Sequence, residues 1–427
     1  MLKKTFNNPI KQDRVVTKYM RTVKGIHRRQ KQLRELYYIT HINNIPSIVS
    51  KGILSHERIE DENIDYTKIY DSDIVSMRKD IEVSEGKGLW SFANLYFNSR
   101  NPMLFRVICE RPPNDIAVIG VDKNILTHQD AYVTTGNAAC EQTEILPIAK
   151  ARKRLEKIIS ETDMVYWREA DGSKRKIMAE CLIPDAVPPH YIKSIYVPSH
   201  DTRLRVQELL QTVSVPYGFS IISQPGMFFQ PSRVIRITNF LFILEGDMFF
   251  SRRHTLTVSV NTMGVMGKGV ASRAKWQFPD VYVQYQHLCR NGQLRMGRPY
   301  LYKRETSFDY EFADDPSTLK SANLQTWFLL FPTKRDWRLN ADIKGIEEGL
   351  QWLCRNYEKD GIESLAIPAL GCGLGGLSWN DVGPLLCKYM STMDIPVSIY
   401  LPTERKISDE LLSKDFLLSK RDSLERF

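Results

Sequence analysis

The 427-residue sequence lacks several features that would assign it to a simple class. Its seven cysteines are scattered, odd in number and without a C-x-x-C pair, which argues against a disulfide framework and against a zinc site. A reducing cytoplasm fits this usage. No apolar run reaches the roughly 18 residues of a membrane span, and the opening MLKKTFNNPI has no signal-peptide core. No internal repeat is visible.

Positive charge is present in excess, with a net charge of +9, and it is unevenly spread. Residues 1–36 contain two acidic side chains, Asp13 and Glu35, and these basic ones: Lys3, Lys4, Lys11, Arg14, Lys18, Arg21, Lys24, Arg28, Arg29, Lys31 and Arg34. Because neutralisation of phosphates by Lys and Arg supplies most non-specific nucleic-acid affinity, this extension is a candidate polyanion-binding arm. A solvated arm without a ligand is the alternative.

The rest of the chain divides into two halves of different texture. Residues 37–232 mix short strand-like runs (MLFRVICE, IAVIGV, IKSIYV) with long polar loops, and SQPGMFFQPSR at 223–233 has the prolines and glycine of a connection. Residues 233–427 alternate strand-like and helix-like runs, from LFILEG to VSIYLP, as in an α/β layer fold. We therefore expect two domains, α+β and then α/β, after the basic extension.

Two glycine-rich loops in the second half each follow a strand-like run and precede a helix-like run. The first, NTMGVMGKGVA at 261–271, leads into SRAKWQFPDVYVQYQHL, which predicts a helix with one apolar face formed by Ala274, Phe278, Val281 and Tyr285. The second is IPALGCGLGGLSW at 367–379. Free N–H groups and the helix dipole at such ends bind anions, most often phosphate, although a plain tight turn would explain either loop alone. Together they are placed to hold a pyrophosphate from two sides.

With EGD, whose Asp247 ends the first strand of this half, these motifs carry a resemblance. The stretch from about 238 to 403 is similar to a macrodomain, the fold that binds ADP-ribose. VNTMGVMGKGVA, FPTKRDWR and IPALGCGLGGLSW together resemble DarG, the antitoxin macrodomain that removes ADP-ribose from DNA. The resemblance implies a three-layer α/β/α fold whose ADP-ribose-binding residues are Asp247 at adenine, Asn261, Gly267, Lys268 and Gly269 at the distal ribose, and Gly371, Cys372, Gly373, Leu374 and Gly375 around the pyrophosphate.

The same resemblance points to Lys334, in FPTK, as the catalytic residue. A lysine near the anomeric carbon can act as a nucleophile, or as an acid or base if its pKa is lowered. The alternative is a surface lysine that grips phosphate together with Arg335 and Arg338.

In the first half, polar side chains lie beside apolar runs in four segments. YYITHINNIPSIVSKGIL predicts an aromatic strand ending in Thr40 and His41, followed by a helix that ends at Gly52. SDIVSMRKD contributes Arg78, LYFNSRNPMLFRVI places Tyr96 and Met103 before an expected buried strand, and MAECLIP places Glu180 inside one. Because a buried unpaired carboxylate costs several kcal/mol, Glu180 is either functional or paired with Lys174, Arg175 or Lys176.

Over about residues 36–230 these segments resemble DarT, the toxin that ADP-ribosylates single-stranded DNA using NAD. The resemblance implies an ADP-ribosyltransferase-like fold, catalysis by Glu180 and Arg78, and NAD binding by Tyr37, Tyr38, Thr40, His41, Tyr96 and Met103. Cleavage of the nicotinamide bond passes through an oxocarbenium-like sugar, which a carboxylate on the ribose hydroxyls would stabilise. The loop before Glu180 offers rings and charge to an unpaired base through the candidate DNA-binding residues Tyr166, Trp167, Arg168, Lys174 and Arg175.

These expectations combine into a cytoplasmic toxin–antitoxin fusion. Its first domain would transfer ADP-ribose from NAD to a base of single-stranded DNA, and its macrodomain would bind that ADP-ribose and hydrolyse it off. NAD is then a substrate, no metal and no membrane are expected, and the oligomeric state is left open. Two alternatives remain: a macrodomain that only reads ADP-ribose, beside an inert first half, and a transferase that modifies protein or RNA.

Overall fold

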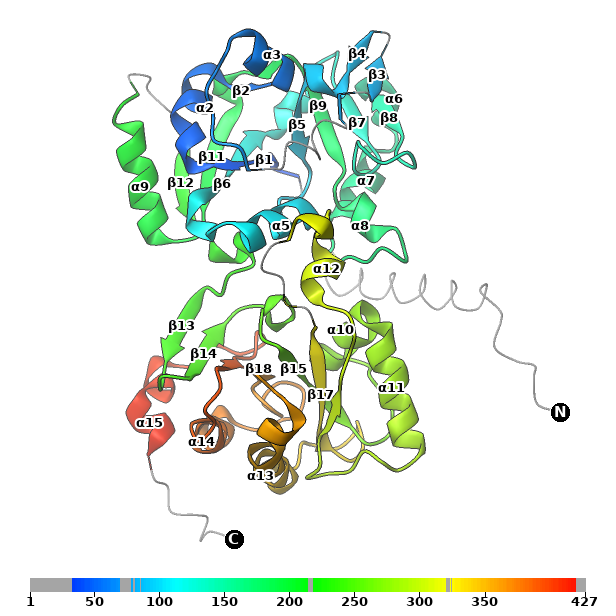
Figure 1. Ribbon diagram of the computed structural model, residues 1–427, viewed down its shortest axis with the longest axis vertical. Coiled ribbons are helices and arrows are strands. Elements are labelled where there is room, and N and C mark those ends of the chain that lie inside the picture. Colours follow the sequence, from blue (N-terminus) through cyan, green and yellow to red (C-terminus); the bar gives the residue numbers. More distant parts are fainter. Residues whose placement is uncertain are drawn as a thin grey trace, which may run out of the picture.

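The structure, a computed structural model, describes residues 33–69, 78–79, 81–84, 86–213, 218–319, 323 and 325–419. The basic extension therefore lies, up to residue 32, outside the described residues. The rest forms two domains stacked along the long axis of the molecule (Figure 1). None of the helices in the described ranges combines the length and apolar character needed to cross a membrane.

Among the described residues, the first domain is built on a mostly antiparallel sheet in the order β12-β11-β6-β1-β5-β9-β7-β8. Its strands are β1 (Glu35–His41), β5 (Phe92–Tyr96), β6 (Ile116–Asp122), β7 (Tyr132–Thr134), β8 (Ile145–Pro147), β9 (Glu180–Pro184), β11 (Ile192–Val197) and β12 (Ser220–Ser223). Two short pairs accompany it, β2 (Ile53–Leu54) with β10 (Ala186–Val187) and β3 (Glu82–Ser84) with β4 (Lys87–Gly88).

This sheet opens between β1 and β5. β1 pairs with β6 along its whole length, from Glu35 opposite Asp122 to His41 opposite Ile116. Its register with β5 consists of one pair, Tyr37 with Tyr96, whereas β5 is paired along its length with β9. The two central strands therefore separate beyond Tyr37, and side chains can line the gap between them.

The helices of the first domain are α2 (Ile45–Lys51), α3 (His56–Asp61), α5 (Pro102–Glu110), α6 (Ile148–Ala151), α7 (Leu155–Thr162), α8 (Ser173–Lys176) and α9 (His200–Leu210). The helix expected to end at Gly52 is confirmed, since Gly52 has φ 93°. The strand expected over MLFRVICE is wrong, because this run forms α5. Asn101 accepts a hydrogen bond from the N–H of Leu104 and Pro102 occupies the first turn, so two helix-start signals outweigh a continuous apolar run that fits either structure.

The second domain has a sheet in the order β13-β14-β19-β18-β15-β17-β16 among the described residues. Neighbours from β14 to β17 are parallel, and the two edge strands are antiparallel to them. The strands are β13 (Arg233–Arg236), β14 (Leu241–Glu245), β15 (Thr255–Asn261), β16 (Tyr300–Tyr302), β17 (Trp327–Lys334), β18 (Leu365–Pro368) and β19 (Val397–Tyr400). Parallel order brings the carboxyl ends of the central strands to one edge, which is where α/β sheets bind ligands.

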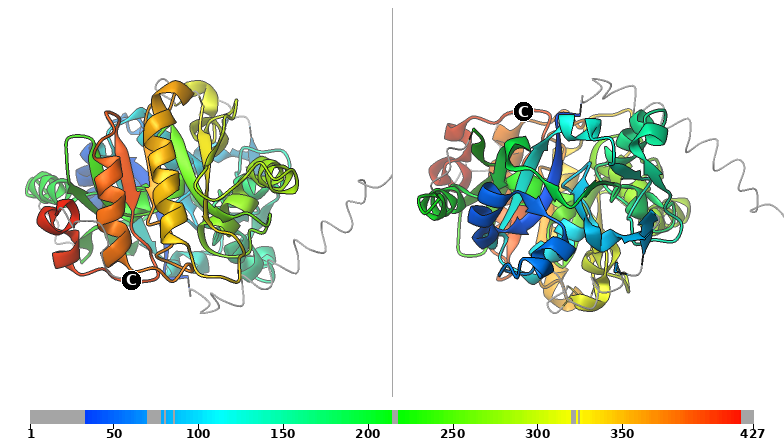
Figure 2. Two further views of the ribbon diagram at one scale, coloured as in Figure 1. Left: turned by 90° about the horizontal axis from the view of Figure 1, so that it is seen from below. Right: turned by 90° about the horizontal axis from the view of Figure 1, so that it is seen from above.

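Helices cover both faces of this sheet. They are α10 (Gly269–Gln277), α11 (Pro279–Arg290), α12 (Phe308–Phe312), α13 (Ile343–Asp360), α14 (Trp379–Met390) and α15 (Lys414–Leu418). Along β17, Phe328 and Leu330 pack in the core that includes α10 and α11, whereas Leu329 and Phe331 pack in the core that includes α13 and α14. The latter two helices lie side by side in the view from below (Figure 2, left). The three-layer α/β/α arrangement is thus confirmed.

One element of the second domain departs from the expected pattern. The single helix expected over SRAKWQFPDVYVQYQHL is two, because α10 ends at Gln277 and α11 starts at Pro279. Proline has no N–H to donate and restricts the residue before it, so the helix breaks at Phe278. The expected apolar face is nevertheless buried at all four positions, Ala274, Phe278, Val281 and Tyr285.

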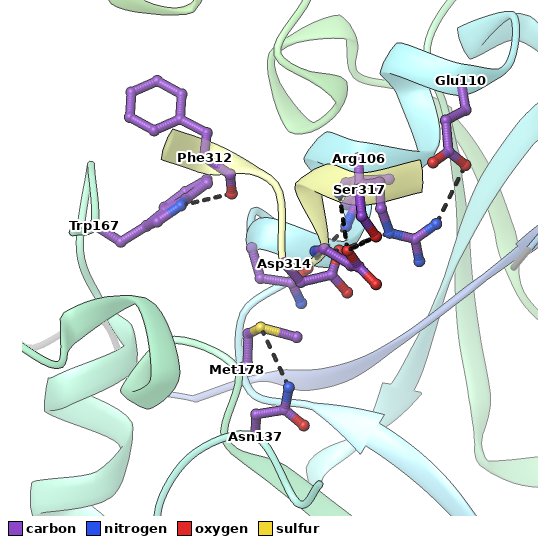
Figure 3. Close-up of polar contacts among 11 residues, drawn as sticks. Arg106, Glu110, Asn137, Trp167, Met178, Phe312, Asp314 and Ser317 are labelled. Atoms are coloured by element: carbon purple, nitrogen blue, oxygen red, sulfur yellow. Dashed lines mark hydrogen bonds and ion pairs between the residues drawn. The ribbon is translucent and has the colours of Figure 1, made fainter. Parts of the chain in front are cut away.

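The two domains share a core at their junction, where α12 of the second domain lies beside α5 of the first (Figure 1). Arg106 of α5, whose side chain is 2% exposed, donates to Asp314 across 2.7 Å and to Glu110 across 3.2 Å. Figure 3 shows this pair beside a second link, in which the indole N–H of Trp167 donates to the carbonyl of Phe312 across 2.9 Å. Apolar burial and a desolvated ion pair therefore hold the domains together.

Two candidate active sites

A cleft of about 1080 Å³ lies at the carboxyl ends of the parallel strands of the second domain. Each central strand contributes the loop that follows it. The strands themselves contribute their last residues, Asn261 of β15 and Lys334 of β17. The loops add Asp247 after β14, Gly267, Lys268 and Gly269 after β15, Gly371, Gly373, Leu374 and Gly375 after β18, and Thr403 and Glu404 after β19. The structure thus brings together the predicted ADP-ribose residues, except Cys372, which is 2% exposed and packs in the core beneath the loop.

The glycines of this cleft have different physical reasons. Gly269 has φ 60° at the start of α10, a conformation that favours glycine. A side chain at Gly375 would place its Cβ 2.5 Å from the carbonyl oxygen of Gly371, so the second loop folds back on itself there. Gly267 has no heavy atom within 4 Å of its Cβ position and no positive φ. The fold would therefore accept a side chain at Gly267, and its absence leaves space for a ligand in the cleft.

The first loop is held in place by Asn261. Its amide donates to the carbonyl of Val265 at 2.6 Å, and its Oδ1 accepts from the N–H of Met263 at 2.9 Å and from the hydroxyl of Tyr285 at 3.0 Å. Helix α10 then begins without a side-chain cap, and its first residues, Gly269, Val270 and Ala271, line the cleft. This is the arrangement that binds a phosphate.

Lys334 joins the two sides of the cleft. Its ammonium group donates to the carbonyl of Leu339 at 2.8 Å and to that of Leu374, in the second glycine loop, at 3.4 Å. Thr262 of the first loop is bonded to the carbonyl of Arg335 through its N–H and its hydroxyl. Three loops therefore meet around the lysine.

Asp247, which follows β14, is one of the two acidic residues that line the described part of the cleft, with Glu404. One carboxylate oxygen accepts from Arg273 at 2.6 Å and the other from the N–H of Phe249 at 3.1 Å. Arg100 of the first domain approaches the same carboxylate, at 3.9 Å, with its guanidinium stacked 4.7 Å from the ring of Phe229. Burial lowers the pKa of Arg100, and the neighbouring Asp247 partly opposes this shift.

A second, smaller cavity of about 60 Å³ opens in the first domain where β1 and β5 separate. Four of the predicted NAD-binding residues line it: Tyr38, Thr40, Tyr96 and Met103. Tyr37 and His41 are not in this lining. The ring of Tyr37 lies edge-on to Tyr196 at 6.3 Å, and the ring nitrogen of His41 accepts from the N–H of Asn43.

Glu180 lies next to this cavity, directly across the strands from Tyr96. Its carboxylate is fully buried and accepts from Arg78 at 2.8 Å and from the N–H of Ala138 at 3.0 Å. The partner is thus Arg78, and not Lys174, Arg175 or Lys176. Burial and the Glu180 charge raise the pKa of Tyr96, which keeps its phenol neutral beside the carboxylate.

Part of the loop expected to bind DNA is buried at the junction between the two domains. Trp167 is 1% exposed and packs against Phe312, Phe250 and Phe229 with ring centroids 5.5 to 6.0 Å apart. This corrects the expectation for Trp167, because a buried ring cannot stack on a base. The cations of the loop are also partnered: Arg168 with Asp171, Lys174 with Glu169, and Arg175 with Thr143. Tyr166 is half-buried.

Comparison with known proteins gives both domains a family. Residues 37–229 match the family described as ssDNA thymidine ADP-ribosyltransferase, DarT, and residues 319–386 match the macro domain family. A DNA ADP-ribosyl transferase–DNA ADP-ribosyl glycohydrolase fusion protein of Thermosipho africanus is 53% identical over 388 residues, 91% of this chain and 99% of that protein. The chain belongs to the DarT–DarG fusion family.

Structure and a more distant relative agree with this. The structure of Thermosipho africanus DarTG in complex with ADP-ribose matches with a TM-score of 0.85, over 90% of this chain and 100% of that one, at 53% identity. A DNA ADP-ribosyl glycohydrolase of Thermus aquaticus is 32% identical over 162 residues, which cover 38% of this chain and 41% of that protein. The first domain is therefore called the transferase domain below and the second the macrodomain.

Several lining residues of the transferase cavity escaped the sequence analysis, namely Asn44, His56, Tyr66, Thr67 and Asn94. Asn44 ties the loop at Thr67 over the cavity through two hydrogen bonds of 2.8 and 2.9 Å and donates to Thr40. His56 stacks on Trp90 at 4.3 Å, and burial together with the Arg78 charge lowers its pKa to about 4. The doubled asparagine in THINN was the one available signal, since polar side chains there interrupt an apolar pattern.

In the macrodomain the missed residues follow the last parallel strand or the helix start. Arg273 lies one turn into α10, and Thr403 and Glu404 follow β19. Topology alone would have indicated the latter two, because every carboxyl end of the parallel strands borders the cleft. Among the residues that the structure describes, no three His, Cys, Asp or Glu side chains cluster in a way that could hold a metal ion.

Proposed function

We propose that this chain writes and erases one mark: its transferase domain moves ADP-ribose from NAD to a base of single-stranded DNA, and its macrodomain removes it. The observation that carries the proposal is the presence, in one member of the DarT–DarG fusion family, of two separate sites suited to the two reactions. The matched family is described by its action on thymidine, so we take thymidine as the acceptor.

In the transferase, NAD would enter the cavity between β1 and β5, against Tyr38, Thr40, Tyr96 and Met103. Transfer breaks the bond between nicotinamide and ribose, forms a bond from the same ribose carbon to a nitrogen of the base, and releases the proton of that nitrogen. Positive charge develops on the sugar in between. Glu180, which is bonded to Arg78 and to the N–H of Ala138, is the group placed to stabilise that charge.

In the macrodomain, Asp247 would accept from the adenine and the uncapped start of α10 and the second glycine loop would hold the pyrophosphate. The distal ribose then lies between the loops that meet at Lys334. We assign to Lys334 the attack on, or proton transfer at, the bond between that ribose and the base. Water replaces the base, which leaves with a proton.

We further propose a division of the chain into a basic extension, 1–36, a transferase domain, 37–232, and a macrodomain, 233–427. Residue 233 is the first of β13, which pairs with β14 of the second sheet. The seven cysteines are all free, which supports a reducing cytoplasm as the compartment.

The proposal is tested by acceptor competition. The full chain is incubated with NAD labelled in its adenylate part and with equal amounts of a mixed single-stranded DNA, the matching RNA, the DNA duplex and an unrelated protein. We expect label on the single-stranded DNA alone, followed by its release as ADP-ribose once NAD is exhausted. Label mainly on RNA or protein would contradict the proposed acceptor, and stable label would mean that the macrodomain only binds ADP-ribose.

A further inference from the structure

The mouth of the macrodomain cleft carries an unusual concentration of exposed apolar side chains. Thirteen large hydrophobic side chains are exposed in the described part of the chain, and five of them belong to the loops around Lys334, where three, Val265, Trp337 and Leu374, line the cleft. We call these five the apolar rim: Met263 (58% exposed), Val265 (41%), Trp337 (53%), Leu339 (58%) and Leu374 (61%). Exposed apolar clusters on a soluble protein mark binding surfaces.

The rim belongs to the three loops that meet at Lys334. Leu339 and Leu374 supply the two carbonyls that accept from the lysine ammonium, and Met263 and Val265 belong to the first glycine loop, which is tied to Arg335 through Thr262. A Cβ at Gly269 would lie 3.5 Å from the side chain of Leu374, so the rim also crosses the start of α10. The rim therefore surrounds the one end of the cleft where bond cleavage is proposed.

Basic groups accompany the apolar ones. The guanidinium of Arg338 lies 5.2 Å from the ring of Trp337 and its side chain is 68% exposed. Arg335 and Lys268 are also exposed. The acidic groups are Asp336, which accepts from the N–H of Arg338 and lies 3.7 Å from its guanidinium, and Glu404, beside Gly373. The face next to Trp337 thus presents a ring and a net positive charge.

We propose that the apolar rim is the binding site for the DNA strand that carries the mark, with Trp337 stacking on a base next to the ADP-ribosylated one and Arg338 on the phosphodiester backbone. This rests on the proposed function, because a ligand cleaved at Lys334 must have its base and strand emerge over the rim. An exposed aromatic ring beside basic side chains is the way proteins bind single strands without reading their sequence. The rim is thus a substrate-recognition surface of the eraser at the edge of the ADP-ribose cleft, whose lining it shares through Val265, Trp337 and Leu374.

The test compares two marked substrates, an ADP-ribosylated oligonucleotide and the ADP-ribosylated nucleoside, in the full chain without NAD. The wild-type chain should release ADP-ribose from the oligonucleotide with a higher kcat/KM than from the nucleoside. Trp337→Ala should lower that ratio about 10- to 100-fold, the loss expected for one base–aromatic stack. Trp337→Phe should restore most of the lost ratio. Arg338→Gln should lower by about one the slope of log kcat/KM for the oligonucleotide against log salt concentration. Val283→Ala, at a 65% exposed position of α11, is the matched control that should leave the ratio unchanged.

The outcomes separate this proposal from the proposed function. A wild-type chain that does not distinguish the two substrates, or a Trp337→Ala ratio equal to that of Val283→Ala, would overturn the rim proposal alone. A Trp337→Ala variant that loses both substrates equally would also overturn it, by making Trp337 a contact of ADP-ribose and not of the strand. Preferential release from an ADP-ribosylated peptide would identify the strand of a protein as the occupant instead. No release from any substrate would contradict hydrolysis itself.

Discussion

The two sites of this molecule differ in what lines them, since one is formed mainly by backbone and the other mainly by side chains. The macrodomain cleft, about 1080 Å³, is formed largely by backbone at the ends of parallel strands, with glycines where a side chain would fill the space. The transferase cavity, about 60 Å³, is formed by side chains in the gap of a split sheet and depends on a buried ion pair. From this difference we expect that a side chain filling the macrodomain cleft abolishes ADP-ribose binding, whereas the loss of one charge abolishes transfer in the first domain.

Filling the backbone-built cleft should have the largest effect. Gly267→Glu adds bulk and negative charge in open space, so the fold tolerates it while the diphosphate does not. Like charges about 4 Å apart repel by roughly 4 kcal/mol at the effective dielectric near a protein surface, which corresponds to about a thousandfold weaker binding of ADP-ribose. Isothermal titration with ADP-ribose measures this.

The matched control is Gly218→Glu, which adds the same charge at an exposed glycine with open space near the edge strand β12 of the transferase domain. It should bind ADP-ribose like the parent chain. Equal affinity of Gly267→Glu and the parent would mean that the glycines only shape a turn, and the assignment of the cleft would be wrong.

The junction between the two sites should respond as a hydrophobic core. Trp167→Ala removes a ring that is 1% exposed and leaves the carbonyl of Phe312 without its donor, so we expect a loss of about 3–5 kcal/mol in the free energy of unfolding. Trp337→Ala, at a 53% exposed ring, should cost less than about 1 kcal/mol. Urea denaturation followed by circular dichroism compares them. Similar midpoints for both variants would contradict a shared core.

The charge-dependent site is probed by Glu180→Gln, which keeps the shape of the side chain and removes its charge. Transfer to DNA should slow at least about a hundredfold, the usual effect of losing one group that stabilises a developing charge. Release of ADP-ribose from marked DNA by the same chain should continue, and this doubles as the control for folding. Unchanged labelling by the variant would remove Glu180 from the mechanism.

The smallest expected effect is a pH dependence of folding stability that originates in the transferase domain. The lining of the transferase cavity contains His56, with its pKa lowered from 6.5 to about 4, whereas the described lining of the macrodomain cleft contains no histidine. Between pH 6.5 and 4, His56 is protonated in the unfolded chain but neutral in the folded chain. Its contribution to the free energy of unfolding is therefore unaffected above pH 6.5 and becomes unfavourable as the pH falls toward 4. Because the ring is partly exposed, we expect about 1–2 kcal/mol.

His56→Phe keeps a ring against Trp90 and cannot titrate, so it should flatten the unfolding midpoint between pH 6.5 and 4. His128→Phe, at an exposed histidine, is the control. If both variants follow the pH profile of the parent chain, the acid sensitivity originates elsewhere.

The same contrast explains what could be predicted from sequence. Glycines that directly follow strands indicate a ligand cleft, so Asn261, Gly267 and Gly375 were sufficient to predict the α/β layer and the lining of its cleft. The transferase cavity assembles Asn44, His56 and Tyr96 from separate segments, and no local pattern encodes the separation of β1 from β5. Trp167 was misjudged because burial against Phe312 depends on a contact between domains, which neither domain's sequence reveals. The helix of α5 was misjudged because Asn101 and Pro102 were weighed less than the apolar run after them.

The central claim, that one chain writes and erases the same mark at separable sites, is tested most directly by Lys334→Ala. The variant and the parent are incubated with labelled NAD and a single-stranded oligonucleotide, and labelled DNA is followed over time. We expect transient label with the parent, persistent label with Lys334→Ala, and none when Glu180→Gln is added to that variant. Label that disappears from Lys334→Ala at the parent's rate would contradict the claim.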